Sequence, residues 1–399
     1  MLLLDLSHTS HSAARTGVQR VALELRKALR AVGDVEEITH DPHAQTWRPL
    51  QAWERSSLDQ PAVAAKKRGA TWPLRAQVSG WWRRQARSHT PVTDFPSNVS
   101  GLIFPEVFTI RTARALPSLF DAISAPKVAI FHDAIALRLP EFSPPGTVAR
   151  FPAYLEELRQ FDGIAAVSED SRQSLLDYWQ WAGWGPGPEV ITLPLGCNHL
   201  ATSSPEVNQT SASPPLRILS VGSLEGRKNH LTLLNASEIL WNAGQRFELD
   251  LIGGLQRETG VTALARIEAL QRAGRPLTYR GWVNDDALIA AYRSATFTVY
   301  PSLMEGFGFP VWESLLHGKP CICSDQGAVA ETARSGGCEL VDTRNVAALA
   351  ECIGRLLSDP NRLESLTVAA QKRRPSRWID YARELTTWLA TLPLKRNLA

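Results

Sequence analysis

The segment EGFGFPVWE places two glutamates eight positions apart, around residues that cannot form one continuous helix. Glu305 and Glu313 enclose two glycines and Pro310, each of which weakens a helix interior, proline most strongly. Because proline is tolerated in the first turn of a helix, we expect a loop that ends at Gly308 and a helix that carries Glu313 in its early part. Such a loop exposes N–H donors to an anion or to sugar hydroxyls. A structural role stays open for Glu313, since an acid at that place also favours the helix dipole.

Two cations, Arg227 and Lys228, precede a predicted helix that begins near Asn229, a good N-cap residue. Cations at a helix N-terminus oppose the macrodipole, at a cost of a few tenths to about 1 kcal/mol. A bound phosphate reverses that sign, because it pairs with the cations and with the free N–H groups. The pattern favours a phosphate clamp over two side chains that simply extend into water.

Polar groups also follow two strands in the first half of the chain, and ligands of open α/β sheets bind outside the carboxyl ends of strands. His132 and Asp133 follow a predicted strand at 127–131, where they either orient a ligand or form a structural pair. Gly17 precedes a helical run and either lets the backbone approach an anionic ligand or forms an ordinary turn. Four strand ends, two in each half, thus suit a phosphorylated, hydroxyl-rich ligand. We expect its site in a cleft between two domains.

Short apolar runs alternate with helix-period segments along most of the chain, which predicts parallel sheets with helices on both faces. The strands expected are 2–6, 101–104, 127–131, 163–167 and 190–193, followed by 217–221, 248–252, 297–300, 320–324 and 338–341. The helices expected include 17–32, 229–242, 284–295 and 345–357. The stretch 198–215 is rich in Ser, Thr, Pro and Asn and is predicted to be a linker between an α/β domain at 1–197 and another at 216–375.

The composition argues against several classes of protein. A net charge of +3 over 399 residues disfavours a nucleic-acid binder driven by global charge. No apolar run approaches the roughly 20 residues that span a bilayer, and MLLLDLS lacks the basic start of a signal peptide. The five cysteines form no CxxC pair, so neither a disulfide framework nor a zinc site is expected. These features favour a reduced, cytoplasmic protein.

One stretch departs from this even charge. Between Asp59 and Asp94 no acidic residue occurs, whereas the stretch holds seven cations and three tryptophans: Lys66, Lys67, Arg68, Arg75, Arg83, Arg84, Arg87, Trp72, Trp81 and Trp82. Tryptophan combined with arginine suits the anionic face of a membrane, which predicts peripheral contact of 66–87 with the inner face of the cytoplasmic membrane. A solvated insertion is the alternative, because Pro73 and Gly80 oppose one uninterrupted amphipathic helix.

Several motifs of the second half resemble those of a known enzyme family. The segments GSLEGRKNH, GWVNDDALIAAYRSA, YPSLMEGFGFPVWESLLHGKP and GAVAE are similar to the C-terminal half of retaining, nucleotide-sugar-dependent glycosyltransferases of the GT-B fold (glycosyltransferase family 4). The Glu-x7-Glu arrangement is that family's signature. The resemblance covers nearly all of 216–342 and continues through TGVQRV, FHDAIAL, VSEDSRQSL and LPLGCN. It implies two Rossmann-like domains with parallel sheets that face each other across a cleft. It also implies a C-terminal helix at 376–392 that returns to the first domain, so that 376–399 packs on 1–197, the acceptor side.

The resemblance implies a role for each motif residue. Arg227 and Lys228 would hold the donor diphosphate and stabilise its growing charge as the glycosidic bond breaks. Glu305 would contact the transferred sugar, Glu313 would accept hydrogen bonds from the ribose hydroxyls, and His132 would lie near the reacting carbon. The implied catalytic set is therefore His132, Arg227, Lys228 and Glu305. The donor-binding set adds Glu313 and the positions Gly17, Gly222, Gly306, Phe307, Gly308 and Phe309. Many relatives carry paired glycines in the first loop, where this chain has Thr16 before Gly17.

The implied activity is hexosyl transfer with retention, in which the leaving phosphate helps to deprotonate the acceptor hydroxyl. TGVQRV and EGFGFPVWE most resemble mannosyl- and rhamnosyltransferases, which favours mannose or a related sugar from a GDP-sugar over a UDP-sugar. The acceptor would be a glycan or a lipid-linked oligosaccharide in the synthesis of a bacterial surface polysaccharide, such as a lipopolysaccharide or an exopolysaccharide, recognised through 41–98. No cofactor and no metal are expected, because the two cations serve the diphosphate.

Alternatives from other classes stay open. A GT-B epimerase or phosphorylase would share the architecture but form no acceptor-linked product. A glycosidase would use Glu305 and Glu313 as acid and nucleophile, which leaves Arg227 and Lys228 unexplained. A non-enzymatic glycan-binding scaffold is disfavoured, because the motif positions of the second half all hold competent residues.

Overall fold

The computed structural model describes residues 1–12, 17–60, 70–86, 95, 98–198 and 215–394. The chain divides into an N-terminal unit, made of Met1–Asp133, Ala149–Gly196 and Ser376–Ala399, and a C-terminal unit, made of Ala134–Val148 and Cys197–Pro375. The predicted linker 198–215 lies, apart from its two end residues, outside the described part of the chain. Segment 134–148 belongs to the C-terminal unit, where the ring of Phe142 occupies the space that a side chain on Gly226 would need.

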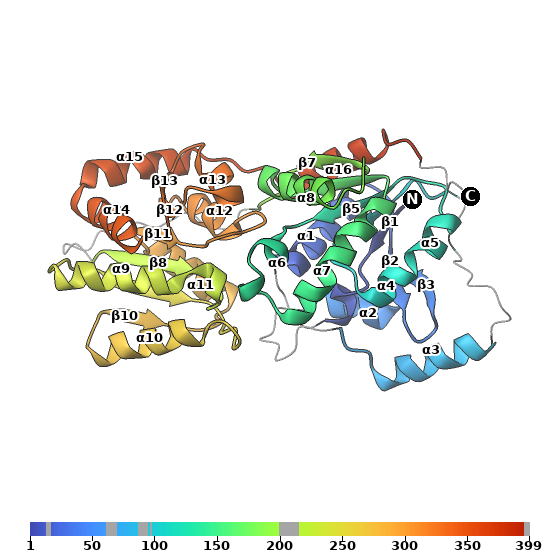
Figure 1. Ribbon diagram of the computed structural model, residues 1–399, viewed down its shortest axis with the longest axis horizontal. Helices are drawn as coiled ribbons and strands as arrows, with labels where there is room; N and C mark the ends of the chain where they lie inside the picture. The colour runs from blue at the N-terminus through green and yellow to red at the C-terminus, as the bar shows by residue number, and fades with distance from the viewer. Residues whose placement is uncertain (13–16, 61–69, 87–94, 96–97, 199–214, 395–399) are drawn as a thin grey trace. The chain divides into compact units, whose positions relative to one another are not determined.

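The N-terminal unit is built on one seven-stranded sheet with the order β3-β2-β1-β4-β5-β6-β7 (Figure 1). Its strands are β1 (Leu2–Asp5), β2 (Val35–Asp41), β3 (Thr46–Pro49), β4 (Gly101–Phe104), β5 (Lys127–Phe131), β6 (Gly163–Ala166) and β7 (Glu189–Thr192). All neighbouring pairs are parallel except β2 and β3, which pair antiparallel at the edge. The strand order reverses direction at β1 and β4, which makes their carboxyl ends the expected ligand position in this sheet.

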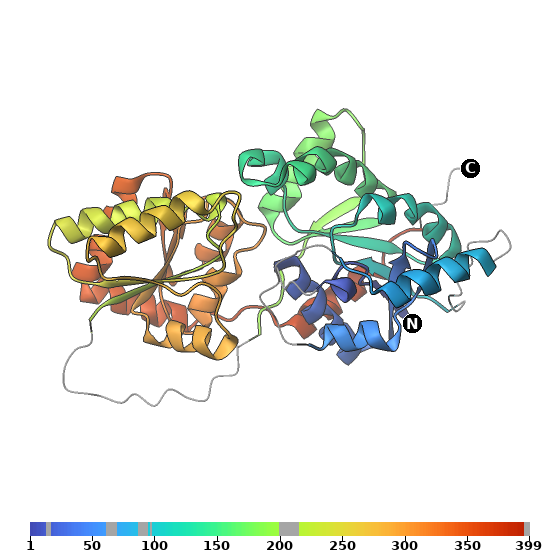
Figure 2. The same ribbon diagram turned by 90° about the horizontal axis from the view of Figure 1, so that it is seen from below.

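Helices cover both faces of this sheet (Figures 1 and 2). They are α1 (Gly17–Val32), α2 (Ala52–Leu58), α3 (Leu74–Ala86), α4 (Ile110–Arg114), α5 (Leu116–Ala122), α7 (Pro145–Glu157), α8 (Glu169–Trp181) and α16 (Trp378–Leu389), with short 3₁₀ turns at Thr9–His11 and Leu158–Gln160. Helix α1 buries Val21, Leu25 and Leu29 at helical spacing, the pattern that predicted it. The C-terminal helix α16 packs against α1 within the same unit.

The C-terminal unit is built on a six-stranded sheet with the order β10-β9-β8-β11-β12-β13, parallel throughout. Its strands are β8 (Arg217–Val221), β9 (Glu248–Ile252), β10 (Leu277–Tyr279), β11 (Phe297–Tyr300), β12 (Cys321–Ser324) and β13 (Cys338–Val341). Strands β11 and β12 are buried along their whole length, as expected for parallel strands covered on both faces. The order reverses at β8 and β11, so the carboxyl ends of these two strands form the switch point of this sheet.

The helices of this unit cover the sheet on both sides (Figure 1). They are α6 (Ile135–Arg138), α9 (His230–Asn242), α10 (Val261–Arg272), α11 (Asp285–Ser294), α12 (Phe309–Leu316), α13 (Gly327–Ala333), α14 (Val346–Ser358) and α15 (Pro360–Gln371), with 3₁₀ turns at Pro140–Phe142 and Gly226–Lys228. The prediction of two Rossmann-like α/β domains is therefore confirmed. Within the described residues, no helix combines the length and the apolar character that crossing a membrane requires.

Candidate active site

A buried group of charges stands at the switch point of the C-terminal sheet. Lys228 Nζ lies 2.6 Å from Glu305 Oε1, and Arg227 Nη1 lies 2.9 Å from Glu305 Oε2. Arg227 and Lys228 follow β8, whereas Glu305 follows β11, so two neighbouring strands bring the three together. The second nitrogen of the Arg227 guanidinium lies 2.7 Å from Glu225. The two cations therefore face carboxylates and do not extend into water.

The turn that carries the two cations is tied to the end of β11. Arg227 and Lys228 lie in the 3₁₀ turn Gly226–Lys228, and the carbonyl of Arg227 accepts the N–H of Leu303 at 2.8 Å. Asn229 has a left-handed backbone (φ 56°), and its amide donates to the carbonyl of Thr343 at 2.7 Å. Asn229 thus occupies the N-cap position of α9, as predicted, but its side chain makes no capping bond and instead fixes the turn.

The electrostatics hold Glu305 in its charged form. Burial works against a charged carboxylate, but the Arg227 and Lys228 cations outweigh it and lower the pKa of Glu305 to about 2. The hydroxyl of Tyr300 donates to the same carboxylate at 2.8 Å. Burial and the nearby Glu305 charge raise the pKa of Tyr300 well above its usual value, so the phenol keeps its proton. The site is therefore fixed as a carboxylate held by two cations and a phenol.

Glu313 stands apart from this group, in the second turn of α12. The loop after β11 ends at Gly308, whose backbone is left-handed (φ 89°), and α12 begins at Phe309 with Pro310 in its first turn, as the sequence predicted. Glu313 is buried, and its Oε2 accepts the hydroxyl of Tyr292 at 2.9 Å. Because α12 has no acid in its first turn, the dipole explanation for Glu313 is weaker than its bond to Tyr292.

The loop between the two glutamates is packed by its aromatic residues. The rings of Phe307 and Phe309 meet edge to face with centroids 5.1 Å apart, and Phe307 is buried. Gly306 is partly buried in the same loop. A side chain on Gly308 would lie 3.3 Å from Val329 as well as strain its backbone. The loop that was predicted to present N–H groups is thus held in one conformation by packing.

His230, which the sequence analysis did not single out, lies beside the cations. It is the first residue of α9 and is buried, and its Nδ1 has no hydrogen-bond partner within the described structure. Burial, helped by the Lys228 charge, lowers the pKa of His230 to about 3, so the ring is neutral. A Cβ on Gly222 would lie 3.6 Å from Lys228 and 3.8 Å from His230, which places Gly222 against both. His230 follows the segment RKN directly at the predicted start of a helix, and this position was a signal in the sequence that could have identified it.

Gly17 and His132, the other predicted site residues, belong to the N-terminal unit. Gly17 is exposed at the start of α1, and a Cβ there would meet no protein atom within 4 Å. His132 is buried after β5, and its Nε2 lies 2.7 Å from the carbonyl oxygen of Pro105. Burial lowers the pKa of His132, so the ring is neutral with Nε2 as the donor. The orientation of the His132 ring is therefore fixed by its bond to Pro105, and not by Asp133 alone.

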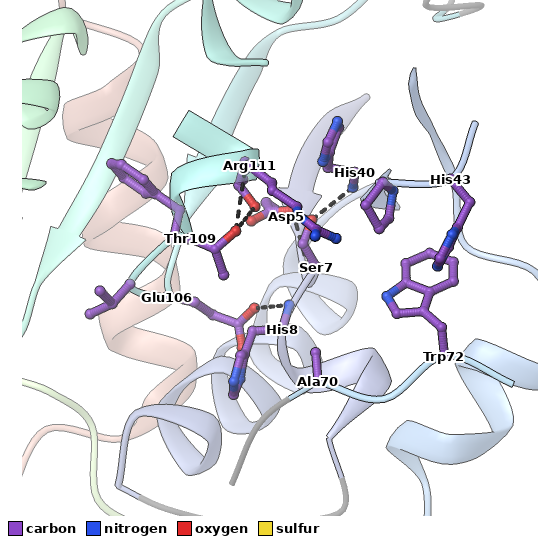
Figure 3. Close-up of a pocket in the computed structure, with 14 residues that line it drawn as sticks. Asp5, Ser7, His8, His40, His43, Ala70, Trp72, Glu106, Thr109 and Arg111 are labelled. Atoms are coloured by element: carbon purple, nitrogen blue, oxygen red, sulfur yellow. Dashed lines mark hydrogen bonds between the residues drawn. The ribbon is translucent and has the colours of Figure 1, made fainter. Parts of the chain in front are cut away.

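The N-terminal sheet has its own cavity, of about 180 Å³, at the carboxyl ends of β1 and β4 (Figure 3). Its lining combines polar side chains with the apolar surface of Trp72, Phe108 and Val107, and consists of Asp5, Ser7, His8, His40, Pro42, His43, Ala70, Trp72, Glu106, Val107, Phe108, Thr109, Arg111 and Thr112. The cavity thus lies at the switch point of this sheet, the expected ligand position. Apolar and aromatic surface with a few polar groups is the usual lining of a small-molecule site.

Two carboxyl groups, Asp5 and Glu106, line this cavity. Burial, together with the nearby Glu106 charge, raises the pKa of Asp5 to about 8, although the N–H of Ser7 donates to it at 3.1 Å. Glu106 accepts the backbone N–H groups of His8 and Thr9, each at 3.0 Å. Asp5 therefore keeps its proton near neutral pH, whereas Glu106 accepts two backbone N–H groups. Neither residue was predicted from the sequence, although Glu106 follows the predicted strand 101–104 by two residues.

The aromatic wall of the cavity comes from the basic stretch. Trp72 stacks on His11 with centroids 3.8 Å apart, and His11 Nε2 lies 2.8 Å from Glu54. These contacts fix the Trp72 ring, which lies at the cavity (Figure 3). Within the described residues, this cavity included, no group of three or more His, Cys, Asp or Glu side chains is placed to hold a metal ion.

Known proteins resemble this chain over its second half most clearly. Residues 206–373 match the family described as glycosyl transferases group 1. This part of the chain is a group 1 glycosyltransferase domain. Over 364 residues, 88% of this chain and 90% of the relative, the chain is 29% identical to O-antigen chain mannosyltransferase B of Escherichia coli. It is also 25% identical over 357 residues to the serotype-specific mannosyltransferase WbdA of Escherichia coli, of whose length it spans 40%.

Solved structures show the same two-domain architecture. Sucrose-phosphate synthase from Thermosynechococcus elongatus superposes over 97% of this chain and 98% of its own, with a TM-score of 0.65 at 17% identity. HepE from Anabaena, in its complex with UDP, covers 98% of this chain and 100% of its own with a TM-score of 0.66 at 16% identity. The glycosyltransferase domain and the N-terminal unit together thus form a GT-B fold.

Proposed function

We propose that the protein transfers mannose, or a related hexose, with retention from a GDP-sugar to a glycan or lipid-linked acceptor of a bacterial surface polysaccharide. The observation that carries this proposal is the buried group of Arg227 and Lys228 on Glu305 at the β8–β11 switch point. The mannosyltransferase relatives support the choice of sugar, since O-antigen chain mannosyltransferase B aligns over most of the chain. A UDP-sugar donor is the alternative.

The charge balance of the group explains how it would take a diphosphate. Arg227 and Lys228 face Glu225 and Glu305, so these four side chains are formally neutral. Arginine offers five N–H donors and lysine three, so bonds to carboxylates leave room to share donors with phosphate oxygens. The cations would then stabilise the charge that develops on the leaving diphosphate. Glu305 would meanwhile keep them in place without any rearrangement of the backbone.

The other proposed donor contacts are those that the family resemblance implies. Glu305 would contact the transferred sugar, and Glu313, fixed by Tyr292, would accept the ribose hydroxyls. The N–H groups of the loop at 306–309 would hold sugar or phosphate, because the loop leads into the N-terminus of α12. His132, from the N-terminal unit, would face the donor sugar. We expect turnover to need no divalent metal, which assays with and without EDTA check directly.

The acceptor would bind at the cavity of the N-terminal unit. Its lining includes His43, Ala70 and Trp72, all from the stretch 41–98 that the sequence analysis assigned to acceptor recognition. Replacing Trp72 by Ala should raise the acceptor KM and leave donor hydrolysis unchanged. A loss of donor hydrolysis in the same variant would contradict this assignment.

The donor proposal is tested by nucleotide release from GDP-mannose, other GDP-hexoses and UDP-sugars. Lys228→Met should lower turnover by about 10²–10³-fold, the usual effect of removing one charge-stabilising donor. It also leaves a buried carboxylate short of a partner, which costs about 3–5 kcal/mol of stability. Lys319→Met, at a half-buried lysine of the same unit, is the matched control and should stay active.

A double variant separates chemistry from folding. In Lys228→Met with Glu305→Gln the buried carboxylate loses its charge together with one of its two cations. Most of the lost stability should therefore return, while turnover should stay low because the diphosphate still lacks Lys228. Turnover that returns together with stability would show that the charge of Lys228 is not needed for transfer. Release of UDP but of no GDP from the wild-type protein would overturn the choice of donor.

A further inference from the structure

Helix α3 concentrates exposed apolar side chains on one face. Leu74, Val78, Trp81 and Trp82 are 77%, 54%, 50% and 63% exposed, and they account for four of the fifteen exposed large apolar residues found in the described chain. Their spacing of four, three and one positions places them along one side of a helix. A face of this kind on a protein surface marks a site of contact with a partner or a membrane.

The opposite side of α3 fixes which way this face points. Gly80 is buried, and a Cβ there would lie 2.7 Å from His43 Cβ and 3.1 Å from the backbone nitrogen of Ala44. Only a glycine lets the helix approach the β2–β3 connection so closely. Figure 1 shows α3 at the margin of the N-terminal unit, near β3 and α2. Gly80, which seemed to oppose an amphipathic helix in the sequence, therefore anchors one.

The charges around this face favour one kind of partner. Arg75, Arg83 and Arg84 are exposed on α3, and the sequence from Asp59 to Asp94 contains no acid between these two residues. Arginine and tryptophan both place an apolar body in the interfacial region of a bilayer with a polar end in water. A protein partner would need a matching acidic surface, whereas anionic lipid headgroups supply that charge at any orientation around the helix.

We propose that the outer face of α3, formed by Leu74, Val78, Trp81 and Trp82, docks the protein on a bilayer that contains anionic phospholipid. The helix would lie in the plane of the interface with its apolar side chains among the headgroups and its arginines on the phosphates. Trp72, two residues before α3, lines the cavity of the N-terminal unit, so docking would hold that cavity close to the lipid surface. The docking itself does not depend on the proposed sugar transfer.

The test is co-sedimentation of the full chain with vesicles of phosphatidylcholine alone or of phosphatidylcholine and phosphatidylglycerol at about 7 to 3. The wild-type protein should bind the anionic vesicles only. Trp81→Ala with Trp82→Ala should weaken this binding at least roughly ten-fold, because two large interfacial rings are lost. Arg83→Gln with Arg84→Gln should weaken it too. These residues are exposed, so the variants should fold, which circular dichroism verifies.

Matched conditions make the outcome decisive. Trp181→Ala, at a tryptophan of α8 that is 80% exposed in the same unit, is the control and should bind like the wild type. Raising the salt from about 0.1 M to about 1 M shortens the screening length from about 10 Å to about 3 Å and should release the protein. Equal loss in Trp181→Ala, or unchanged binding in the double tryptophan variant, would overturn the proposal. So would a wild-type protein that binds neither vesicle, which would point to a protein partner for this face.

Discussion

Replacing Asp5 by Asn should stabilise the protein, and the gain should grow with pH. Asp5 is buried at the end of β1, and its raised pKa of about 8 contrasts with an ordinary value of 3.8. Between these two values the folded protein keeps a proton that the unfolded chain releases. Folding therefore becomes less favourable as the pH rises from about 4 to about 8. Asparagine cannot ionise, and its oxygen can still accept the N–H of Ser7.

The magnitude follows from the pKa difference. One pKa unit corresponds to about 1.4 kcal/mol. The ionisable group therefore lowers the free energy of unfolding by about 2 kcal/mol at pH 5 and by about 4 kcal/mol at pH 7, relative to a group that never ionises. Below pH 3.8 the difference between Asp and Asn at this position should vanish. Above pH 8 it should reach a plateau, because the folded protein then releases the proton as well.

Urea unfolding of the wild type and of Asp5→Asn at pH 4, 5, 6, 7 and 8 measures this difference directly. Asp34→Asn, at an exposed position of the same unit, is the control, and its effect should stay within about 0.5 kcal/mol at every pH. A gain that is the same at pH 5 and pH 8 would refute the reasoning. So would a loss of stability at pH 8, since either result means that Asp5 is already ionised in the folded protein at pH 5.

Three further results are expected. Tyr292→Phe removes the hydroxyl that donates to buried Glu313 and should cost about 1–3 kcal/mol in urea unfolding; an unchanged midpoint would contradict that bond. Glu305, with a folded pKa of about 2, should contribute about 3 kcal/mol above pH 4.5 that disappears as the pH falls towards 2; Glu305→Gln should abolish this pH dependence. Gly101→Ala should be destabilised by about 1–3 kcal/mol through overpacking against Leu389, and a sub-additive double variant with Leu389→Ala would confirm that contact.

The sequence predicted the strands that a short apolar run marks, and it missed β2, β3 and β10. Strand β2 reads VEEITHD, with two adjacent acids, so no apolar run marks it. Glu37 is nevertheless buried, because Arg26 lies 2.6 Å and Arg30 lies 2.9 Å from its Oε1. Both arginines come from α1, the helix that connects β1 to β2. A buried charged residue in a strand is thus stabilised by ion-pair partners from another element. The periodicity of the sequence does not reveal such partners.

Some residues of the two candidate sites could be predicted from the sequence, and others could not. Arg227, Lys228 and Glu305 could be found because each follows a strand of recognisable pattern. Glu305 holds both cations only because the order of the strands places β8 beside β11. The sequence does not reveal this order. Asp5 and Glu106 are about a hundred residues apart and meet only because β1 lies beside β4. Strand order is a property of the packed sheet, and local sequence carries little of it.

The C-terminal helix shows how a residue choice can depend on a distant part of the chain. Gly101 and Gly163 begin β4 and β6, and neither needs a left-handed backbone. A Cβ on Gly101 would collide with Leu389, and one on Gly163 would lie 2.7 Å from Trp388 and from Leu392. The last helix thus lies so close to these strands that only glycine fits beneath it. Two glycines in the first half of the chain are therefore explained by α16, which begins more than 200 residues later, and α16 is part of the packing of the N-terminal unit.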